Sequence, residues 1–220
     1  MNRVLVVSPH PDDETLGAGG TLLRYKEEGS DIYWINFTNM KEDYGYTKER
    51  VRSRNDEINK VKKLFGFKNV YNLELEPSGL DKYSRMELIL HVSEIVRDIE
   101  PNIILLPNRE DIHSDHKIVF DTMFACTKSF RYPSIKKVLV MEIISETDFS
   151  YNPTAFRPNY FIDITKYVDK KIEIMKVYES ELKEHPFPRS IENLIALAIN
   201  RGAMAGKHYA EAFMLIKAIE

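Results

Sequence analysis

The sequence has little cysteine, no long apolar run and no excess of basic residues. The single cysteine, Cys126, cannot form an intramolecular disulfide, so stability must come from a packed core. The 31 Lys and Arg residues are outnumbered by 34 Asp and Glu, which argues against a general nucleic-acid binder. No apolar stretch approaches the ~18 residues of a membrane span. The first apolar run ends after residue 7, so the N-terminus does not read as a signal peptide. We therefore expect a cytoplasmic protein with no nucleic-acid partner and no membrane anchor.

What the chain does contain is typical of a globular domain. Hydrophobic residues make up 43% of the 220 residues and charged residues 30%, which is close to ordinary usage in folded proteins. There is no repeat of fixed period, no Ser/Gly-rich linker and no difference in charge between the two halves. These features predict a single domain over residues 1–220.

Short apolar or β-branched runs alternate with segments of helical spacing. The runs predicted as strands are residues 4–7, 32–37, 70–75, 103–106, 138–144 and 160–164, and the predicted helices between them are 15–28, 49–65 and 86–99. This alternation predicts a Rossmann-like α/β fold, with a mainly parallel sheet and helices on both faces. In such sheets ligands bind beyond the carboxyl ends of the strands.

The last third of the chain is predicted to be a mostly helical C-terminal part. It comprises residues 166–182, a Pro-rich elbow at 185–188 and an Ala-rich run at 190–219. Such a part could cover a site or pack on its own domain. It could also bury a face against a second copy, which leaves a homo-oligomer open.

A cluster of polar residues directly follows the first predicted strand. His10, Asp12, Asp13 and Glu14 lie within five positions, and prolines flank His10. Like charges at the end of a strand cost free energy unless a cation binds there, which favours a metal site. The alternative is an ordinary turn in which one aspartate caps the next helix. The glycines at 17, 19 and 20 do not fit the dinucleotide-binding fingerprint and instead predict close packing of that helix on the sheet.

A second polar cluster follows the predicted strand at 103–106. It contains His113, Asp115 and His116, so that with His10 three of the six histidines lie in two loops after parallel strands. A catalytic zinc takes three N or O ligands and leaves a position for water. His10, one aspartate and one of these two histidines would supply them. A remaining carboxylate could act as the base, and the other histidine, oriented by Asp115, as a hydrogen-bond donor.

The residues alone leave three questions open. They do not decide between Asp12 and Asp13 as the metal ligand, although neighbouring carboxylates in a stiff turn point apart. His113 and His116 straddle the expected start of a helix, which permits them separate roles. Two histidines and one carboxylate could also hold Fe²⁺ for oxygen chemistry or another divalent metal, although an adjacent free carboxylate favours hydrolysis.

These motifs resemble the LmbE-like or PIG-L family of zinc-dependent N-acetylglucosaminyl deacetylases. The resemblance lies in Pro9-His10-Pro11-Asp12-Asp13-Glu14 with the following glycines, and in His113-x-Asp115-His116. Weaker similarity extends to Arg54-x-x-Glu57, Pro158-Asn159, Lys170-Lys171, Tyr178-Glu179-Ser180 and residues 209–213. The family resemblance implies a hydrolase that removes the N-acetyl group from an N-acetylglucosamine-type sugar or sugar conjugate.

The same resemblance implies a role for each site residue. His10, Asp13 and His116 would bind Zn²⁺, and Asp12 would be the general base that activates water. His113 would stabilise the oxyanion or protonate the departing amine, with Asp115 holding its ring. Arg54 matches a family arginine near the acetyl or sugar-binding region. Glu14 would be a supporting or capping group.

The substrate beyond the acetylated sugar is not determined by these residues. The segment 39–47, with Tyr44 and Tyr46, is long enough to form a lip over a site, and its aromatic rings would suit stacking on a sugar. One alternative is a zinc amidase that acts on a non-sugar N-acyl substrate. Another is a non-catalytic α/β binding module, which would leave the charged loops without a purpose.

Overall fold

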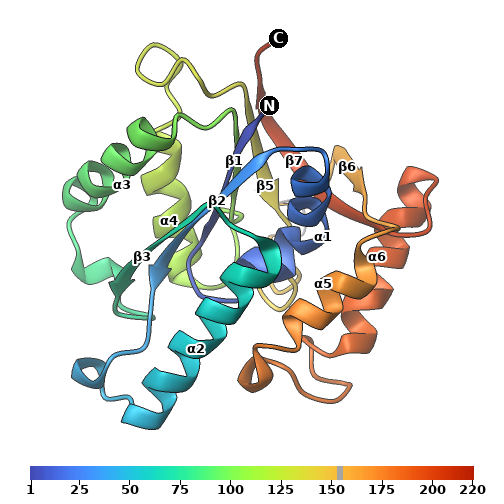
Figure 1. The fold of residues 1–220 in the computed structure, drawn as a ribbon, viewed down its shortest axis with the longest axis horizontal. Coiled ribbons are helices and arrows are strands. Elements are labelled where there is room, and N and C mark those ends of the chain that lie inside the picture. Colours follow the sequence, from blue (N-terminus) through green and yellow to red (C-terminus); the bar gives the residue numbers. More distant parts are fainter. Residues whose placement is uncertain (153–155) are drawn as a thin grey trace.

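A mixed sheet runs through the computed structural model, which describes residues 1–152 and 156–220. Its order is β3-β2-β1-β4-β5-β7-β6. β1 to β5 are parallel, and β7 is antiparallel to both β5 and β6. The strands are β1 (Arg3–Ser8), β2 (Asp31–Thr38), β3 (Asn69–Leu75), β4 (Ile103–Leu106), β5 (Lys137–Met141), β6 (Tyr160–Asp163) and β7 (Ala210–Ala218). The predicted α/β fold with a mainly parallel sheet is confirmed (Figure 1).

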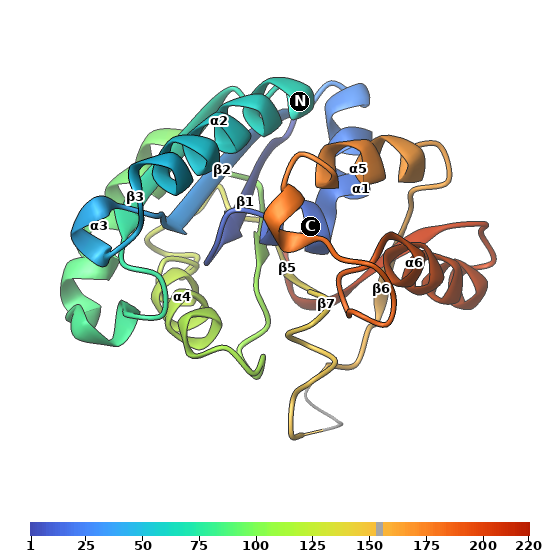
Figure 2. The ribbon, with the colours of Figure 1, turned by 90° about the horizontal axis from the view of Figure 1, so that it is seen from below.

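Helices cover both faces of this sheet, as the alternating pattern predicts. One face packs on α1, α2, α5 and α6, and the other on α3 and α4 (Figure 2). Alternate residues of β1 divide between the two cores, Val4 and Val6 facing the first and Leu5 and Val7 the second. The helices are α1 (Asp13–Glu27), α2 (Lys48–Phe65), α3 (Arg85–Ile99), α4 (Ser114–Ala125), α5 (Val168–Met175) and α6 (Ile191–Ala205). Short 3₁₀ turns are η1 (Glu42–Tyr44), η2 (Leu80–Lys82) and η3 (Glu179–Glu181).

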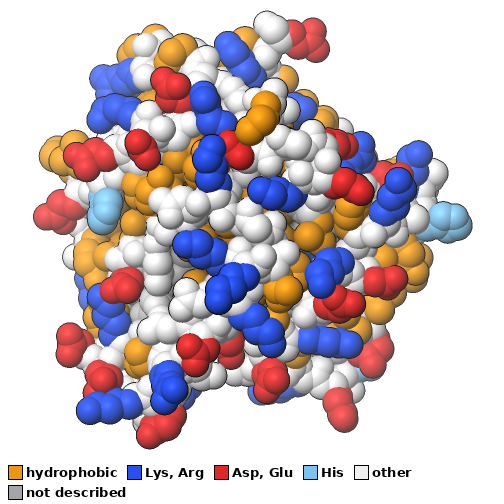
Figure 3. Space-filling model, viewed as in Figure 1, with side chains coloured by type: hydrophobic (Ala, Val, Ile, Leu, Met, Phe, Trp, Pro, Cys, Tyr) orange, Lys and Arg blue, Asp and Glu red, His pale blue; other side chains and the backbone are white. Residues whose placement is uncertain are grey.

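The outer surface of the first helical layer is polar. Side chains of both charges lie interspersed with apolar side chains over the face that α2 and α5 cover (Figure 3). This is the character of amphipathic helices whose apolar side faces a sheet. Along the described residues, every helix is too short or too polar to cross a membrane.

The prediction of helix over the whole run 190–219 is wrong at its C-terminal end. α6 ends at Ala205, and the residue that caps it, Gly206, has a φ of 65°, the left-handed conformation that terminates helices. The chain then forms β7, whose Ala210, Ala212 and Phe213 are buried between β5 and β6. Alanine and methionine favour helices locally, but the open edge of β5 offers this segment a full set of hydrogen-bond partners. Tertiary pairing therefore overrides local propensity here.

The order of the strands places the two polar clusters side by side. β1 and β4 are neighbours in the sheet. After β1 the chain crosses to β2 on one side, and after β4 it crosses to β5 on the other side. The crevice at such a switch point is where open α/β sheets bind ligands. The loop after β1 carries His10, and the loop after β4 carries His113. Figure 2 looks onto this carboxyl edge of the sheet.

The glycines of α1 allow the close packing that their sequence pattern predicts. A Cβ atom on Gly17 would lie 2.9 Å from the Met141 side chain, and one on Gly20 would lie 2.7 Å from Ile164. α1 therefore approaches the sheet more closely than a side chain would permit. This approach holds the start of α1, and with it Asp13, against the end of β1.

A glycine of α6 leads to a prediction about stability. A Cβ atom on Gly202 would lie 2.6 Å from the backbone oxygen of His208. Gly-to-Ala changes inside helices ordinarily stabilise by about 1 kcal/mol. Because backbone cannot move aside cheaply, we expect Gly202→Ala to lower the free energy of unfolding by about 1–3 kcal/mol instead.

Urea denaturation would measure this change. The control is Ala203→Gly at the exposed neighbouring position, which we expect to cost about 1 kcal/mol through helix propensity alone. An increase in stability in Gly202→Ala would show that the contact with the His208 backbone does not constrain the helix.

Candidate active site

Two loops and two helix starts bring the predicted site residues together. His10 and Asp12 lie in the turn after β1, and Asp13 begins α1. His113 is the N-cap of α4, so it precedes the helix, whereas His116 lies within its first turn. The two histidines therefore straddle a helix start, as their spacing predicts. His10, Asp13 and His116 form one group, and His113 and Asp115 lie beside it.

The first three residues form a compact set of possible metal ligands. Nδ1 of His10 and Nε2 of His116 each lie 3.4 Å from Oδ2 of Asp13. The candidate ligand atoms of the three residues all lie within 4.8 Å of one another. Asp13 is 3% exposed and His116 is fully buried, so the carboxylate and the imidazole face each other away from water. Two nitrogens and one oxygen are a donor set that zinc and other divalent transition metals accept.

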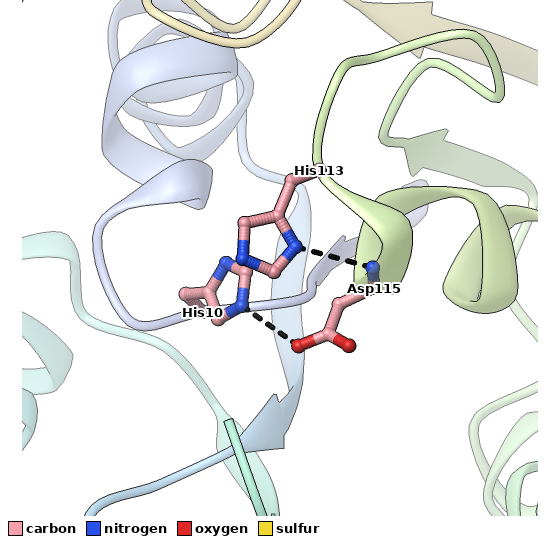
Figure 4. Close-up of side chains that lie close together, drawn as sticks. All are labelled: His10, His113 and Asp115. Carbon is pink, nitrogen blue, oxygen red and sulfur yellow. Dashed lines mark hydrogen bonds and ion pairs between the residues drawn. The ribbon is translucent and has the colours of Figure 1, made fainter. Parts of the chain in front are cut away.

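The other ring nitrogen of each histidine is held by a carboxylate. Nε2 of His10 lies 3.1 Å from Oδ2 of Asp115, and Nδ1 of His116 lies 2.8 Å from Oδ2 of Asp111 (Figure 4 for the first). Such bonds fix the ring orientation and tautomer of metal-binding histidines. Asp111 was missed by the sequence analysis. The sequence offered only one signal for Asp111, an acid five positions before a candidate ligand. That spacing is common, and the contact with His116 becomes evident only from the path of the loop.

Two observations show that these residues fit a cation. Nε2 of His116 is a buried polar atom with no hydrogen-bond partner among the described residues, and it faces Asp13. Burial alone would lower the pKa of a histidine, but hydrogen bonds to Asp115 and Asp13 raise the pKa of His10 to about 9. Burial would likewise raise the pKa of Asp13, yet the neighbouring histidines hold that pKa far below its usual range. The raised pKa of His10 reflects the negative potential that Asp13 and Asp115 create at this ring, a potential that a bound cation would also neutralise.

Asp12 occupies an unusual backbone conformation beside this group. Its φ is 138°, in a region that residues other than glycine rarely adopt. The carboxylate of Glu14 accepts a hydrogen bond from the Asp12 backbone N–H at 3.1 Å, and Tyr178 and Thr15 hold that carboxylate in turn. Burial and the charge of Asp13 raise the pKa of Asp12 well above its usual value. Glu14 therefore supports the backbone of the turn that carries Asp12.

His113 contacts Asp115 through the backbone of that residue and not through its carboxylate. The backbone N–H of Asp115 donates to Nδ1 of His113 at 3.1 Å, while the Asp115 carboxylate faces His10 and accepts the backbone N–H of Ser78 (Figure 4). Because Nδ1 accepts a hydrogen bond, the neutral ring carries its proton on Nε2. Burial and the charge of His10 lower the pKa of His113 to about 4, so the neutral ring predominates.

Arg54 is almost fully occupied by protein partners. It is 4% exposed, donates to the backbone oxygen of Pro11 at 2.9 Å and to Oγ of Ser180 at 3.1 Å, and pairs with Glu181 and Glu57. These contacts brace the turn that carries Asp12 against the segment around η3. Contact of Arg54 with a substrate stays a prediction, because its guanidinium already has these partners.

A cavity of about 280 Å³ opens beside the site. Tyr46 and Met40 from the segment 39–47 line it, whereas the Tyr44 hydroxyl instead donates to the backbone oxygen of Glu74. From the C-terminal part come Glu181 and Arg189, which the sequence analysis did not identify. The full lining is His10, Pro11, Asp12, Asp13, Thr38, Asn39, Met40, Tyr46, Arg54, Pro77, Ser78, His113, Glu146, Glu181 and Arg189.

Comparison with known proteins identifies the family. Residues 5–127 match the family model of PIG-L, described as GlcNAc-PI de-N-acetylase. The chain belongs to the PIG-L family. It is 26% identical over 233 aligned residues to the diacetylchitobiose deacetylase of Thermococcus kodakarensis, an alignment that covers 100% of this chain and 85% of that protein. Membership confirms the family inferred from the two motifs, and with it the expectation of a hydrolytic N-deacetylase.

Solved structures share the fold over nearly the whole chain. The N,N'-diacetylchitobiose deacetylase of Pyrococcus horikoshii superposes with a TM-score of 0.78 at 23% identity, covering 98% of this chain and 84% of that one. The conserved protein TT1542 of Thermus thermophilus has the same TM-score at 25% identity, with coverages of 100% and 97%. The PIG-L fold therefore extends beyond residue 127 into the C-terminal part.

Proposed function

We propose that this chain is a zinc-dependent hydrolase that removes the acetyl group from an N-acetylglucosamine-type sugar. The observation that carries the proposal is the group of His10, Asp13 and His116, of which the last two are buried, with the separate carboxylate of Asp12 beside it. Three ligands and a free carboxylate at the mouth of a cavity are what metal-assisted hydrolysis of an amide requires. The family, and the diacetylchitobiose deacetylase that aligns over this whole chain, support an acetylated sugar as the substrate class.

His10, Asp13 and His116 would hold the metal, and Asp115 and Asp111 would orient the two histidines. A bound divalent metal lowers the pKa of water and polarises the carbonyl oxygen of an amide. The residues that hold it are rigid, because both imidazoles are fixed by carboxylates and Asp13 begins a helix packed on the sheet. The donor set fits zinc, and Fe²⁺ shares this preference.

Asp12 would accept the proton of the attacking water and later deliver it to the leaving amine. Its carboxylate lines the cavity, and its raised pKa moves its basicity towards neutral pH, where a general base works well. Glu14 holds the strained backbone of Asp12, so the carboxylate is positioned before substrate arrives.

His113 would stabilise the negative charge that develops on the amide oxygen. Its Nδ1 is engaged by the Asp115 N–H, so Nε2 carries the proton, and in the cavity this atom lies 3.4 Å from Oγ of Ser78, a weak contact that a ligand oxygen could replace. A neutral donor of this kind suits an oxyanion better than it suits protonation of an amine. Of the two roles that the family resemblance implies for His113, this geometry favours the first.

Acetate release from a panel of N-acetyl compounds tests the proposal. The panel contains N-acetylglucosamine, diacetylchitobiose, the malate and inositol conjugates of N-acetylglucosamine, its UDP-linked form and an N-acetyl amino acid. We expect release from a sugar, loss of that release with a chelator, and recovery on adding Zn²⁺. Release from the amino acid alone would instead support the non-sugar amidase. Release that the chelator leaves unchanged would contradict the metal.

A further inference from the structure

Two arginines line the cavity, and their environments differ. Arg54 is buried and donates its hydrogen bonds to the protein. Arg189 donates no hydrogen bond to any described residue, although its Nε atom is buried. Its nearest acidic neighbours are Oε2 of Glu181, 3.4 Å from one terminal nitrogen, and Oδ2 of Asp12, 3.8 Å from the other. The side chain of Arg189 is 23% exposed and lines the cavity, and its two terminal nitrogens make only these loose ion contacts, so they are placed to donate hydrogen bonds to a ligand there.

The position of Arg189 is fixed by its surroundings. Its guanidinium lies 5.5 Å from the centre of the Phe187 ring, a cation–π distance. The next residue, Ser190, is the buried N-cap of α6 and receives the backbone N–H of Asn193 on its side chain. The Asn193 side chain also donates to the backbone oxygen of Pro188. Arg189 is therefore held at the cavity by the packing of its neighbours, and among the described residues its own donors make only the two loose ion contacts.

We propose that Arg189 and Glu181 form the part of the cavity that binds the sugar hydroxyl groups next to the acetamide. A hydroxyl group both donates and accepts a hydrogen bond, and this pair offers guanidinium donors that make no hydrogen bond to a described residue, beside a carboxylate acceptor. Oε1 of Glu181 is engaged by Arg54 and Ser180, while Oε2 faces Arg189. The pair borders Asp12, so groups bound there lie close to the amide that reacts. This inference rests on the proposed function and names the residues that determine its specificity.

Charge and size favour a neutral sugar over an anionic conjugate at this position. The cavity lining has four carboxylates, from Asp12, Asp13, Glu146 and Glu181, against the two arginines. A divalent metal would only balance this charge, so an added carboxylate or phosphate would meet no net attraction. At about 280 Å³ the cavity is at the lower end of the range for small-ligand sites, which suits one sugar ring.

The test compares wild type with Arg189→Met, which keeps an apolar stem, and Arg189→Lys, which keeps the charge but loses the planar fork. Arg24→Met, at a surface ion pair with Glu28, is the matched control. Binding of glucosamine and of acetate to the zinc-loaded proteins is measured by calorimetry, because these products bind without turnover. Acetate release from N-acetylglucosamine and from its malate conjugate gives KM and kcat. Thermal denaturation checks that each variant is folded.

We expect Arg189→Met to weaken glucosamine binding by about 10- to 100-fold, with acetate binding unchanged. The KM for N-acetylglucosamine should rise by a similar factor while kcat changes little, and Arg189→Lys should lie between. Unchanged glucosamine binding would overturn the inference. A loss confined to kcat would also overturn it, since Arg189 would then act only on Asp12. Weaker binding of acetate, or a loss confined to the malate conjugate, would show that Arg189 binds an anion instead.

Failure of the proposed function has a different signature. Wild-type protein would then release no acetate from any N-acetyl sugar, whatever metal is supplied. Glucosamine binding and its dependence on Arg189 would still be measured directly in that case. Wild-type protein that releases acetate but has the same glucosamine affinity as Arg189→Met would refute the role of Arg189 alone.

Discussion

Replacing Asp12 with asparagine should reduce acetate release by about 10²- to 10⁴-fold while leaving the metal bound, as expected for loss of a general base. The change removes the proton acceptor but keeps the size of the side chain. Asparagine also tolerates positive φ better than most residues, so the turn at φ 138° should be retained. The metal should stay because Asp13, not Asp12, faces His10 and His116.

Asp13→Asn is the informative comparison, because it changes the next residue in the same way. We expect this variant to lose both metal and activity, since the amide is a weaker ligand than the carboxylate that both histidines face. Metal content is measured by elemental analysis of dialysed protein, and activity by acetate release. If Asp12→Asn keeps more than a tenth of the activity, Asp12 is not the base. If it loses the metal instead, the assignments of Asp12 and Asp13 are exchanged.

The parallel half of the fold could be predicted because its signals are local. The first four strands are short apolar runs, and each helix between them has an apolar stripe and a recognisable end. β7 could not be predicted in this way, because residues 210–218 are compatible with a helix until the free edge of β5 is known. The pairing of β7 with β5 depends on segments about 75 residues apart, as in Val140 with Met214. No pattern within one segment contains that information.

The candidate site likewise has features that local sequence patterns predict and features that depend on tertiary contacts. That His10, one aspartate and one histidine of the second loop would meet could be predicted because both loops follow parallel strands, whereas the choice of Asp13 and His116 came from the family resemblance. The contact between Asp115 and His10 joins residues from both loops, and their spacing in sequence says nothing about which atoms face each other. Arg189 directly follows the Pro-rich elbow, in a segment that has no periodicity, and it reaches Asp12 only because the chain returns to the sheet.

This division has a consequence for specificity. The segment that matches the PIG-L family model, residues 5–127, contains the candidate metal ligands, the proposed base and the proposed oxyanion donor. Glu181 and Arg189 come from beyond it, as do Tyr178, which holds Glu14, and Ser180, which holds Arg54. The C-terminal part thus both supports the catalytic turn and forms one wall of the cavity. Changes of substrate within such a fold would therefore be expected in the wall residues, with the chemistry retained.

The C-terminal part is also tied to α1 by a buried ion pair, and breaking it should be strongly destabilising. Nζ of Lys171 lies 2.7 Å from the Glu211 carboxylate and donates to the backbone oxygen of Leu16 at 2.8 Å. Glu211 also accepts the backbone N–H groups of Gly20 and Thr21. Both charged residues are less than 10% exposed. We expect Lys171→Met to lower the free energy of unfolding by about 3–5 kcal/mol, because it leaves a buried carboxylate without its counter-charge.

The neighbouring lysine provides the control. Lys170 makes an exposed pair with Glu173, so Lys170→Met should cost less than about 1 kcal/mol. The double variant Lys171→Met with Glu211→Gln removes both charges, and we expect it to recover part of the loss because no net charge stays buried. Chemical denaturation of the metal-free proteins measures all three. A single-variant loss no larger than that of Lys170→Met would mean that water reaches Glu211, and that packing alone holds the C-terminal part on α1.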